Sequence, residues 1–436
     1  MARPILEGLP TELLILILLE IPDLTSLKFV VLSSPIFYQV YLTARQRVLC
    51  HIVKSQWGVL LGDAMAATRS RGLFFDSRKH EAIAVLDTWR RKEEIRNLAW
   101  TSSNRIDEPG SLEEILHLLY LHKAFDFFLE DYAKNIPQPP WMEDDQLETS
   151  ILPIELSQTE KHRLLRALCR LQTYKNIFGY PERRGGEEWI RNNWDLKKQS
   201  SNDRNSGEEA YRVFFGTIPP WEYHEMACVW VYFTTMFDPI YEDITTGLYD
   251  LVEKYRSKDP QDAWQRPYFI FLPEEARLPM GGLESLQSLE NLPDQSKSLA
   301  SMGPEFVYRL LHSTPLIQRD MVILNTKDDI FSSFSGSWLL EEDKLPFLYP
   351  ADRHALQNYE QFWSTLPYIE QPNLGWKKMH LVPDTPEQTF EDAIDLEGGH
   401  ESVWRLGLAI FDDERLMAWK APLSEYRLGQ VPDTTV

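Results

Sequence analysis

The residues with the clearest potential for chemistry are His224, Glu225 and Cys228. A four-residue spacing puts the imidazole and the thiol on one face of a helix, where they could start a metal site or a Cys/His nucleophilic pair. No third group that would orient such a pair follows at a suitable spacing. The same stretch is dense with aromatic residues: Trp221, Tyr223, Trp230, Tyr232 and Phe233. We therefore expect a partly buried polar pair, and we predict no metal and no cofactor.

Neighbouring acidic residues are a second candidate for chemistry, as a general acid and base. They occur at Asp328-Asp329, Glu341-Glu342-Asp343 and Asp412-Asp413. Residues adjacent on a helix do not face each other, so we expect solvated charge at all three places. His400 and Glu401 follow two glycines and could contact a ligand from a turn, but entry into a helix is the simpler interpretation.

Motifs of established enzyme classes do not occur in the chain. It contains no GxxxxGK[ST], GxGxxG, HExxH or GxSxG pattern. We predict that the chain is not an enzyme. An α-helical enzyme without a recognisable motif remains as an alternative.

Composition points to a folded, acidic protein. The 436 residues are 43% hydrophobic and 25% charged, and the formal net charge is −21. Such a charge repels phosphate backbones and anionic lipids, so neither nucleic acid nor a membrane is expected as a partner. Four basic residues share one predicted helix, and we expect them to form a solvated face: Arg163, Arg166, Arg170 and Lys175.

Cysteine usage and the N-terminal apolar run bear on the compartment. Cys50, Cys169 and Cys228 lie far apart without CxxC spacing, which indicates reduced, buried thiols in the cytoplasm or the nucleus. The apolar run 13–19 is far shorter than the roughly 20 residues of a membrane span. Acidic residues and prolines flank it, so we expect no targeting segment.

Three short helices are predicted in the first fifty residues. Pro10 suits the first turn of a helix over about 10–21, and Pro22 ends it. Asp23 is a good N-cap for a second helix over 24–32, and Ser34 before Pro35 is typical of the start of a third. The first helix is apolar on nearly every face, so the rest of the chain or another protein must cover part of it.

The same residues carry a resemblance. The stretch reads Leu9-Pro10-x-Glu12-Leu13-Leu14-x-x-Ile17-Leu18-x-x-Ile21-Pro22-Asp23-Leu24-x-Ser26-Leu27, followed by Val31-Leu32-Ser33-Ser34-Pro35-x-Phe37-Tyr38-x-x-Tyr41. This pattern resembles the F-box of filamentous-fungal F-box proteins. It departs from the family where aromatic residues replace the frequent tryptophan, and where the basic residue that usually follows the serine is missing.

The resemblance implies a function. F-box proteins dock on a Skp-type adaptor, which joins them to a cullin, and so recruit substrates to an SCF-type ubiquitin ligase. Seven residues match the family's apolar docking pattern: Leu9, Pro10, Leu13, Ile17, Leu24, Leu27 and Val31. The resemblance implies that this chain binds the adaptor and, through it, the cullin, together with a protein client that the sequence does not identify. A helical scaffold whose F-box works outside the ligase is an alternative.

Beyond the F-box the chain reads as helix after helix, so we predict an all-α protein. The expected organisation is an F-box domain at 5–50 and a helical client-binding or structural region at 57–436, with a possible division near 273–304. Capping boxes are predicted at Ser111 with Glu114 and at Ser157 with Glu160. Further helices are predicted over about 80–98, 220–237, 239–257, 304–312, 352–366 and 402–418. No repeat of 20 to 50 residues is evident.

Two aromatic-rich segments complete the sequence-based expectations. The pattern Trp404-x-x-Gly407-x-x-x-Phe411-Asp412-x-x-Arg415-Leu416-x-x-Trp419 is similar to the tails of many filamentous-fungal F-box proteins. We expect its aromatic residues to share one helix face and to pack, with Arg415 stacked on Trp419. Residues 211–271 are rich in Trp, Tyr and Phe, which could line a client-binding groove, although core packing is the favoured interpretation.

Overall fold

The computed structural model describes residues 6–90, 108–139, 141–142, 152–179, 181–182, 214, 218–256, 296–297, 299–325, 366–380 and 404–421. All regular structure in these ranges is helical, and none of it is strand, which confirms the all-α prediction. The α-helices are α1 (Thr11–Leu19), α2 (Leu24–Ser33), α3 (Pro35–Trp57), α4 (Leu61–Arg69), α5 (Phe75–Arg90), α7 (Leu112–Lys134), α8 (Gln158–Phe178), α11 (Pro220–Arg256), α13 (Pro304–Leu311), α14 (Pro315–Asn325), α17 (Leu374–His380) and α20 (Asp413–Ala418). Short 3-10 turns, η1 (Leu6–Gly8), η2 (Gly58–Leu60) and η12 (Tyr368–Glu370), lie between some of them.

The first three helices begin where their capping residues predict. Pro10 is the N-cap of α1. The Asp23 carboxylate accepts hydrogen bonds from the backbone N–H of Ser26 at 2.8 Å and from its hydroxyl at 2.7 Å, so it caps α2. The Ser34 hydroxyl accepts from the backbone N–H of Ile36 at 3.2 Å, with Pro35 in the first turn of α3. The three helix starts therefore coincide with local sequence signals, with Pro10 one position before the first turn in which it was predicted.

Helix α3 connects the N-terminal helices to the rest of the molecule. Its first half packs against α1 and α2, and its second half packs against α4 and α7. At its end the Trp57 indole donates a hydrogen bond to the Leu118 carbonyl of α7 at 3.2 Å, and the ring meets Phe125 edge to face. The predicted domain boundary at residue 50 falls inside α3, which continues without a break to Trp57.

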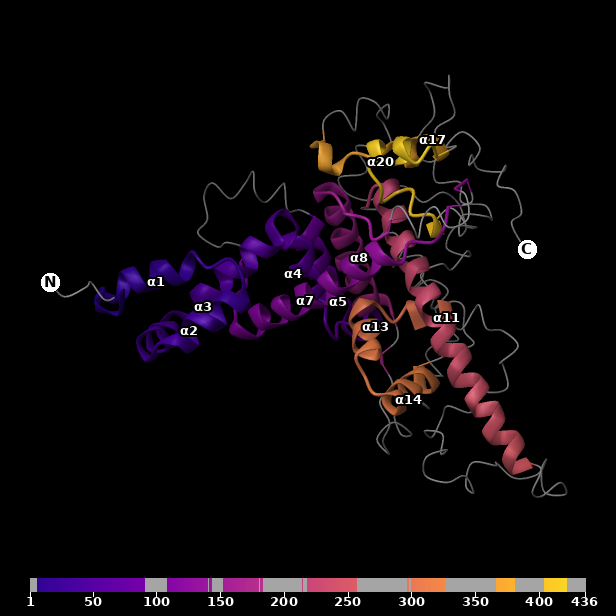
Figure 1. Ribbon diagram of the computed structural model, residues 1–436, viewed down its shortest axis with the longest axis horizontal. Coiled ribbons are helices and arrows are strands. Elements are labelled where there is room, and N and C mark those ends of the chain that lie inside the picture. The colour runs from indigo at the N-terminus through magenta and orange to yellow at the C-terminus, as the bar shows by residue number, and fades with distance from the viewer. Residues whose placement is uncertain are drawn as a thin grey trace.

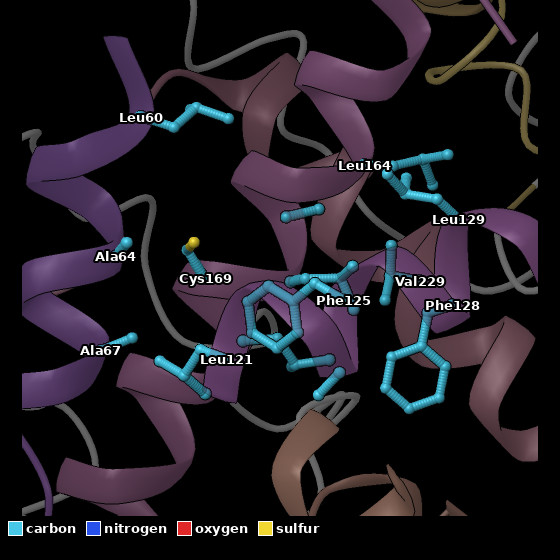
Figure 2. Close-up of a cluster of buried hydrophobic side chains, with 14 of the residues drawn as sticks. Leu60, Ala64, Ala67, Leu121, Phe125, Phe128, Leu129, Leu164, Cys169 and Val229 are labelled. Atoms are coloured by element: carbon cyan, nitrogen blue, oxygen red, sulfur yellow. The ribbon is translucent and has the colours of Figure 1, made fainter. Parts of the chain in front are cut away.

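The body is built around α8, which packs against α4, α5, α7, α11 and α13. In Figure 1 the N-terminal helices lie at one end of the molecule, and α11 extends away from the body on the opposite side. Figure 2 shows the centre of the core, where Ala64 of α4, Phe125 of α7, Cys169 of α8 and Val229 of α11 converge. All four side chains are buried, and the same hydrophobic cluster continues through α3 into the N-terminal helices. One core therefore joins the two ends of the molecule.

Both predicted capping boxes mark helix starts, but only one closes completely. Ser157 and Glu160 satisfy each other's backbone N–H groups at the start of α8. At the start of α7 the Ser111 hydroxyl accepts from the Glu114 backbone N–H, while the Glu114 carboxylate accepts from the backbone N–H of Gly110. Glu114 also pairs with Arg69 of α4, so its carboxylate serves a tertiary contact as well as the cap.

One prediction about helix extent was wrong at Pro239. Residues 220–256 form a single helix, α11, with Pro239 inside it, whereas a break was predicted there. Proline removes one backbone hydrogen bond from the helix. Helix α11 nevertheless continues through Pro239, because Phe237, two residues before the proline, is buried and Ile240, directly after it, packs against the core. The helix predicted over 352–366 lies outside the described residues, as does the end of the one predicted over 80–98.

The C-terminal segment also differs from its prediction. We expected one helix over 402–418, but among the described residues of this segment helix occurs only at 404–405 and in α20, and residues 406–410 between them form turns. Gly407 has a φ of 65°, a left-handed conformation that interrupts a right-handed helix. The aromatic residues Trp404 and Phe411 are nevertheless buried as predicted, and the Arg415 guanidinium lies 5.6 Å from the Trp419 ring centroid.

The turn at Gly407 provides a test of this packing. A side chain there would overlap the hydroxyl of Tyr132 and the ring of Phe411, in a backbone conformation that alanine disfavours. Gly407→Ala should therefore lower the free energy of unfolding by about 2 kcal/mol, measured by urea denaturation. Gly247→Ala is the control, because that position in α11 is open and should gain up to about 1 kcal/mol. Equal stability of the two variants would contradict the observed turn.

Candidate partner-binding site

Exposed apolar residues are concentrated in the N-terminal lobe, which we define as residues 6–44, comprising η1, α1, α2 and the first turns of α3. Of the sixteen large hydrophobic residues that are exposed in the described part of the chain, ten belong to this lobe. They are Leu6, Leu9, Leu13, Leu16, Leu24, Phe29, Leu32, Ile36, Tyr38 and Leu42. Exposed apolar residues scattered singly are normal, but a concentration of this kind indicates an interaction surface.

The other apolar residues of the lobe are buried in its interior. Leu14 and Leu18 of α1 point inward, together with residues of α2 and α3 such as Phe37 and Val40. Helix α1 packs on α3, and α2 packs on α3 as well. Three short helices can bury only one side of each, so the remaining apolar positions stay at the surface.

The seven residues matched to the docking pattern divide into three groups. Leu9, Pro10, Leu13 and Leu24 are exposed on the lobe, where a second protein could contact them. Ile17 is half-buried. Leu27 and Val31 are buried in the lobe, so they hold α2 against α3 and do not form part of its outer surface. A role of these residues in docking stays a prediction.

Several exposed residues of the lobe were not singled out from the sequence. Phe29 and Leu32 of α2 are each 69% exposed, the highest values among the exposed large hydrophobic residues described. Ile36, Tyr38 and Leu42 lie on the outer side of α3. The sequence contains one indication of this exposure, because the first ten residues of α3 carry no charge and have only uncharged polar residues such as Gln39 and Thr43 to face water.

A second notable feature is a buried network of charges on α8, which corrects the expectation of a solvated basic face. Arg166 is only 2% exposed and binds Glu225 of α11 through two parallel hydrogen bonds of 2.6 and 2.9 Å. Arg166 also lies 2.8 Å from the carboxylate of Glu222. Arg170 pairs with Asp63 of α4 at 3.0 Å and with Glu222. The expectation was wrong because acidic residues of α4 and α11 neutralise these arginines inside the protein.

The first turns of α8 form a similar junction with the C-terminal segment. Glu160 is fully buried and accepts two hydrogen bonds from Arg415, at 2.6 and 2.7 Å, and one from the backbone N–H of Asp412 at 3.0 Å. Arg163 donates to the Asp412 carboxylate and to the Ile410 carbonyl, both at 2.9 Å. Burial alone would raise the pKa of Glu160, but the hydrogen bonds from Arg415 hold it below its ordinary value.

Asp412 and Asp413 are therefore not the solvated charges that we expected. Asp412 pairs with Arg163, and the Asp413 carboxylate accepts a hydrogen bond from the Leu374 backbone N–H at the start of α17. The other acidic groups singled out from the sequence, 328–329 and 341–343, lie outside the described residues. So do His400 and Glu401.

The His224 and Cys228 pair is buried, and its surroundings serve packing. The Trp404 indole donates a hydrogen bond to Nδ1 of His224 at 3.2 Å, and Glu225 is engaged by Arg166. Burial raises the pKa of the Cys228 thiol to about 12, which keeps it protonated and weakens it as a nucleophile. Within the described ranges, no three His, Cys, Asp or Glu side chains are grouped so as to hold a metal ion.

The aromatic residues proposed for a client groove behave as core in the part of 211–271 that is described. Trp221, Trp230, Phe233 and Phe237 are each at most 1% exposed. The Trp230 indole donates to the Ser301 hydroxyl at 3.0 Å, which attaches the chain before α13 to α11. These residues therefore offer no open groove, and the N-terminal lobe remains the strongest candidate site.

Comparisons with known proteins do not identify a relative of this chain. No family model, no curated protein and no solved structure matches this chain. Among the described helices, none combines the length and the apolar composition that crossing a membrane requires.

The charge network predicts an acid sensitivity that centres on His162. Burial, and then the positive charge of Arg166, lower the pKa of His162 to about 3. The folded protein therefore keeps this imidazole neutral, while the unfolded chain takes up a proton below about pH 6.5. The contribution of His162 to the free energy of unfolding is therefore fully present above pH 6.5 and is lost progressively as the pH falls toward 3.

His162→Gln should flatten this decline. Between pH 6.5 and pH 4.5 the wild type should lose about 2 kcal/mol more free energy of unfolding than the variant, measured by urea denaturation at each pH. His51→Gln, at an exposed position of α3, is the control and should follow the wild type. Parallel curves for His162→Gln and the wild type would refute this assignment.

Proposed function

We propose that this protein is a substrate-recruiting subunit of an SCF-type ubiquitin ligase, which binds a Skp-type adaptor through its N-terminal lobe and carries a protein client on its helical body. The proposal combines the resemblance of residues 9–41 to an F-box with a physical property of those residues. It assigns no catalytic chemistry to the chain. The ubiquitin transfer would belong to other subunits of the ligase.

The observation that carries the proposal is the exposed apolar surface of the lobe. Leu9, Leu13 and Leu24, which match the docking pattern, are exposed together with seven further large hydrophobic residues of the same 39-residue lobe. Covering them removes apolar area from water, and this is the main driving force of protein association. The residues beneath, such as Leu14 and Leu18, are buried and hold the helices in place.

The connection through α3 supports a role in positioning a client. The helix is 23 residues long, which corresponds to about 34 Å, and it belongs to the lobe at one end and to the body at the other. Val48, Ile52 and Val53 anchor its second half in the core of the body. A protein bound to the lobe would thus keep a defined orientation relative to the body, which raises the effective concentration of a client near the ligase.

The body exposes apolar residues singly and not in one concentrated surface. Among the described residues outside the lobe, six large hydrophobic residues are exposed, and they are spread over five elements: Val59, Leu116, Leu316, Ile317, Tyr368 and Met417. The client is therefore left unassigned in this proposal.

The proposal is tested by capture of partners with the double variant Leu13→Glu, Leu16→Glu. Both positions are about half exposed on α1, so the variant should fold normally while placing two charges in the apolar contact. Recovery of the Skp-type adaptor should fall at least tenfold relative to the wild type, with loss of the cullin in parallel. Leu316→Glu, an exposed leucine on α14, is the matched control and should retain both proteins.

The outcomes separate the alternatives. Recovery of adaptor and cullin by the wild type supports the ligase subunit, and recovery of the adaptor without the cullin supports a scaffold that works outside the ligase. Recovery of neither protein by a folded wild type rejects the F-box assignment. Undiminished adaptor binding by the double variant would show that docking uses a different surface.

A further inference from the structure

We infer that, in the absence of the adaptor, two copies of this chain associate through their N-terminal lobes, so that self-association and adaptor binding compete for one surface. The self-association follows from the lobe itself. The competition rests on the proposed function, because it requires that the adaptor use the same surface.

The size of the exposed apolar surface is the first argument. If a large apolar residue presents roughly 180 Å² when fully exposed, the ten exposed residues of the lobe together present on the order of 900 Å². A stable protein interface takes about 800 Å² from each partner. The summed apolar area of the lobe therefore reaches what one partner contributes to a stable dimer, provided that the contact spans α1, α2 and the first turns of α3.

The charge content of the lobe is the second argument. Residues 6–44 contain five charged side chains, Glu7, Glu12, Glu20, Asp23 and Lys28, which is about one residue in eight, whereas 25% of the whole chain is charged. Depletion of charge at the centre is what distinguishes interfaces from ordinary surface. The four acidic residues and the single lysine give the lobe a net charge of −3, so apolar area and not net electrostatic attraction must drive the association of two copies.

The distribution of these charges suits a second copy. A two-fold interface brings the same surface of both chains together, so its charges must be compatible with themselves. Within the helices of the lobe, Glu12 lies on α1 and Lys28 lies on α2. Pairing α1 of one copy with α2 of the other places charges of opposite sign on facing helices. In such a contact Glu12 of one copy can pair with Lys28 of the other, while the acidic caps Glu20 of α1 and Asp23 of α2 must stay at its edge.

Helix α2 should be central to this contact. Phe29 and Leu32 are its most exposed apolar residues, and neither was among the seven residues matched to the adaptor-docking pattern. Buried Leu27 and Val31 hold α2 in place from the other side. Substitutions at Phe29 and Leu32 can thus weaken the contact without opening the core of the lobe.

The experiment is sedimentation equilibrium of the purified full chain from low to high micromolar concentration. The mass of the wild type should rise from 51.0 kDa toward twice that value and then level off. Phe29→Glu combined with Leu32→Glu should raise the dissociation constant at least tenfold. Leu316→Glu on α14 is the matched control and should dimerise like the wild type. Circular dichroism should show the same helix content for all three proteins.

Adaptor titration tests the competition separately. Added Skp-type adaptor should convert the dimer into a complex of one chain and one adaptor. A wild type that stays monomeric, a mass that rises without levelling off, or a dimer unaffected by the lobe variant would each overturn the self-association. An adaptor that binds the intact dimer would overturn the competition. A dimer that ignores the adaptor would reject the proposed function while leaving the self-association standing.

Discussion

The neutralisation of three arginines on α8 is the constraint on which the body of this protein depends. Arg163 and Arg166 are buried and Arg170 is partly buried on α8, the helix that packs against five others, and a buried guanidinium without a carboxylate would cost several kcal/mol. Their counter-charges come from α4, α11 and the C-terminal segment. The helices that surround α8 are thus held in register by charge as well as by apolar packing.

Uncharged polar residues of α8 extend the same principle. Asn176 donates to the Ala67 carbonyl and to the Ser70 hydroxyl at the end of α4, and Gln172 accepts from the Glu305 backbone N–H at the start of α13. Each bond satisfies a buried polar group that would otherwise oppose folding. Because these contacts are directional, they specify one arrangement of helices where apolar contacts alone would permit several. Replacing such a network by apolar residues could preserve stability, so specificity is the better explanation for it here.

The N-terminal lobe differs from the body in the kind of residue that it leaves at its surface. Its helices carry few charges, and its apolar residues exceed what three short helices can enclose. The body pairs its buried arginines with acidic residues, whereas the lobe leaves apolar side chains exposed at its surface. Helix α3 links the two regions rigidly, so whatever covers the lobe is held at a defined position relative to the body. This division of roles is the physical basis of the proposed recruiting function.

Features that depend on local interactions could be predicted from the sequence. The caps at Asp23, Ser34 and Ser157 involve residues within three positions of each other, so the helix starts they define were predicted correctly. The need of the first helix for a cover was also visible, because a helix that is apolar on nearly every face cannot be enclosed by a small unit. The turn at Gly407 was missed because glycine alone does not reveal a positive φ.

Packing between distant segments sets which charges meet and which apolar residues stay exposed. The spacing of Arg163, Arg166 and Arg170 is equally compatible with a solvated face, and their pairing inside the protein depends on acidic residues 52 to 249 positions away along the chain. Similarly, Leu24 and Leu27 both fit the docking pattern, but packing of α2 on α3 buries Leu27 and leaves Leu24 exposed. Periodicity predicts that a helix has an apolar side, whereas the direction in which that side points is set by the neighbouring helices.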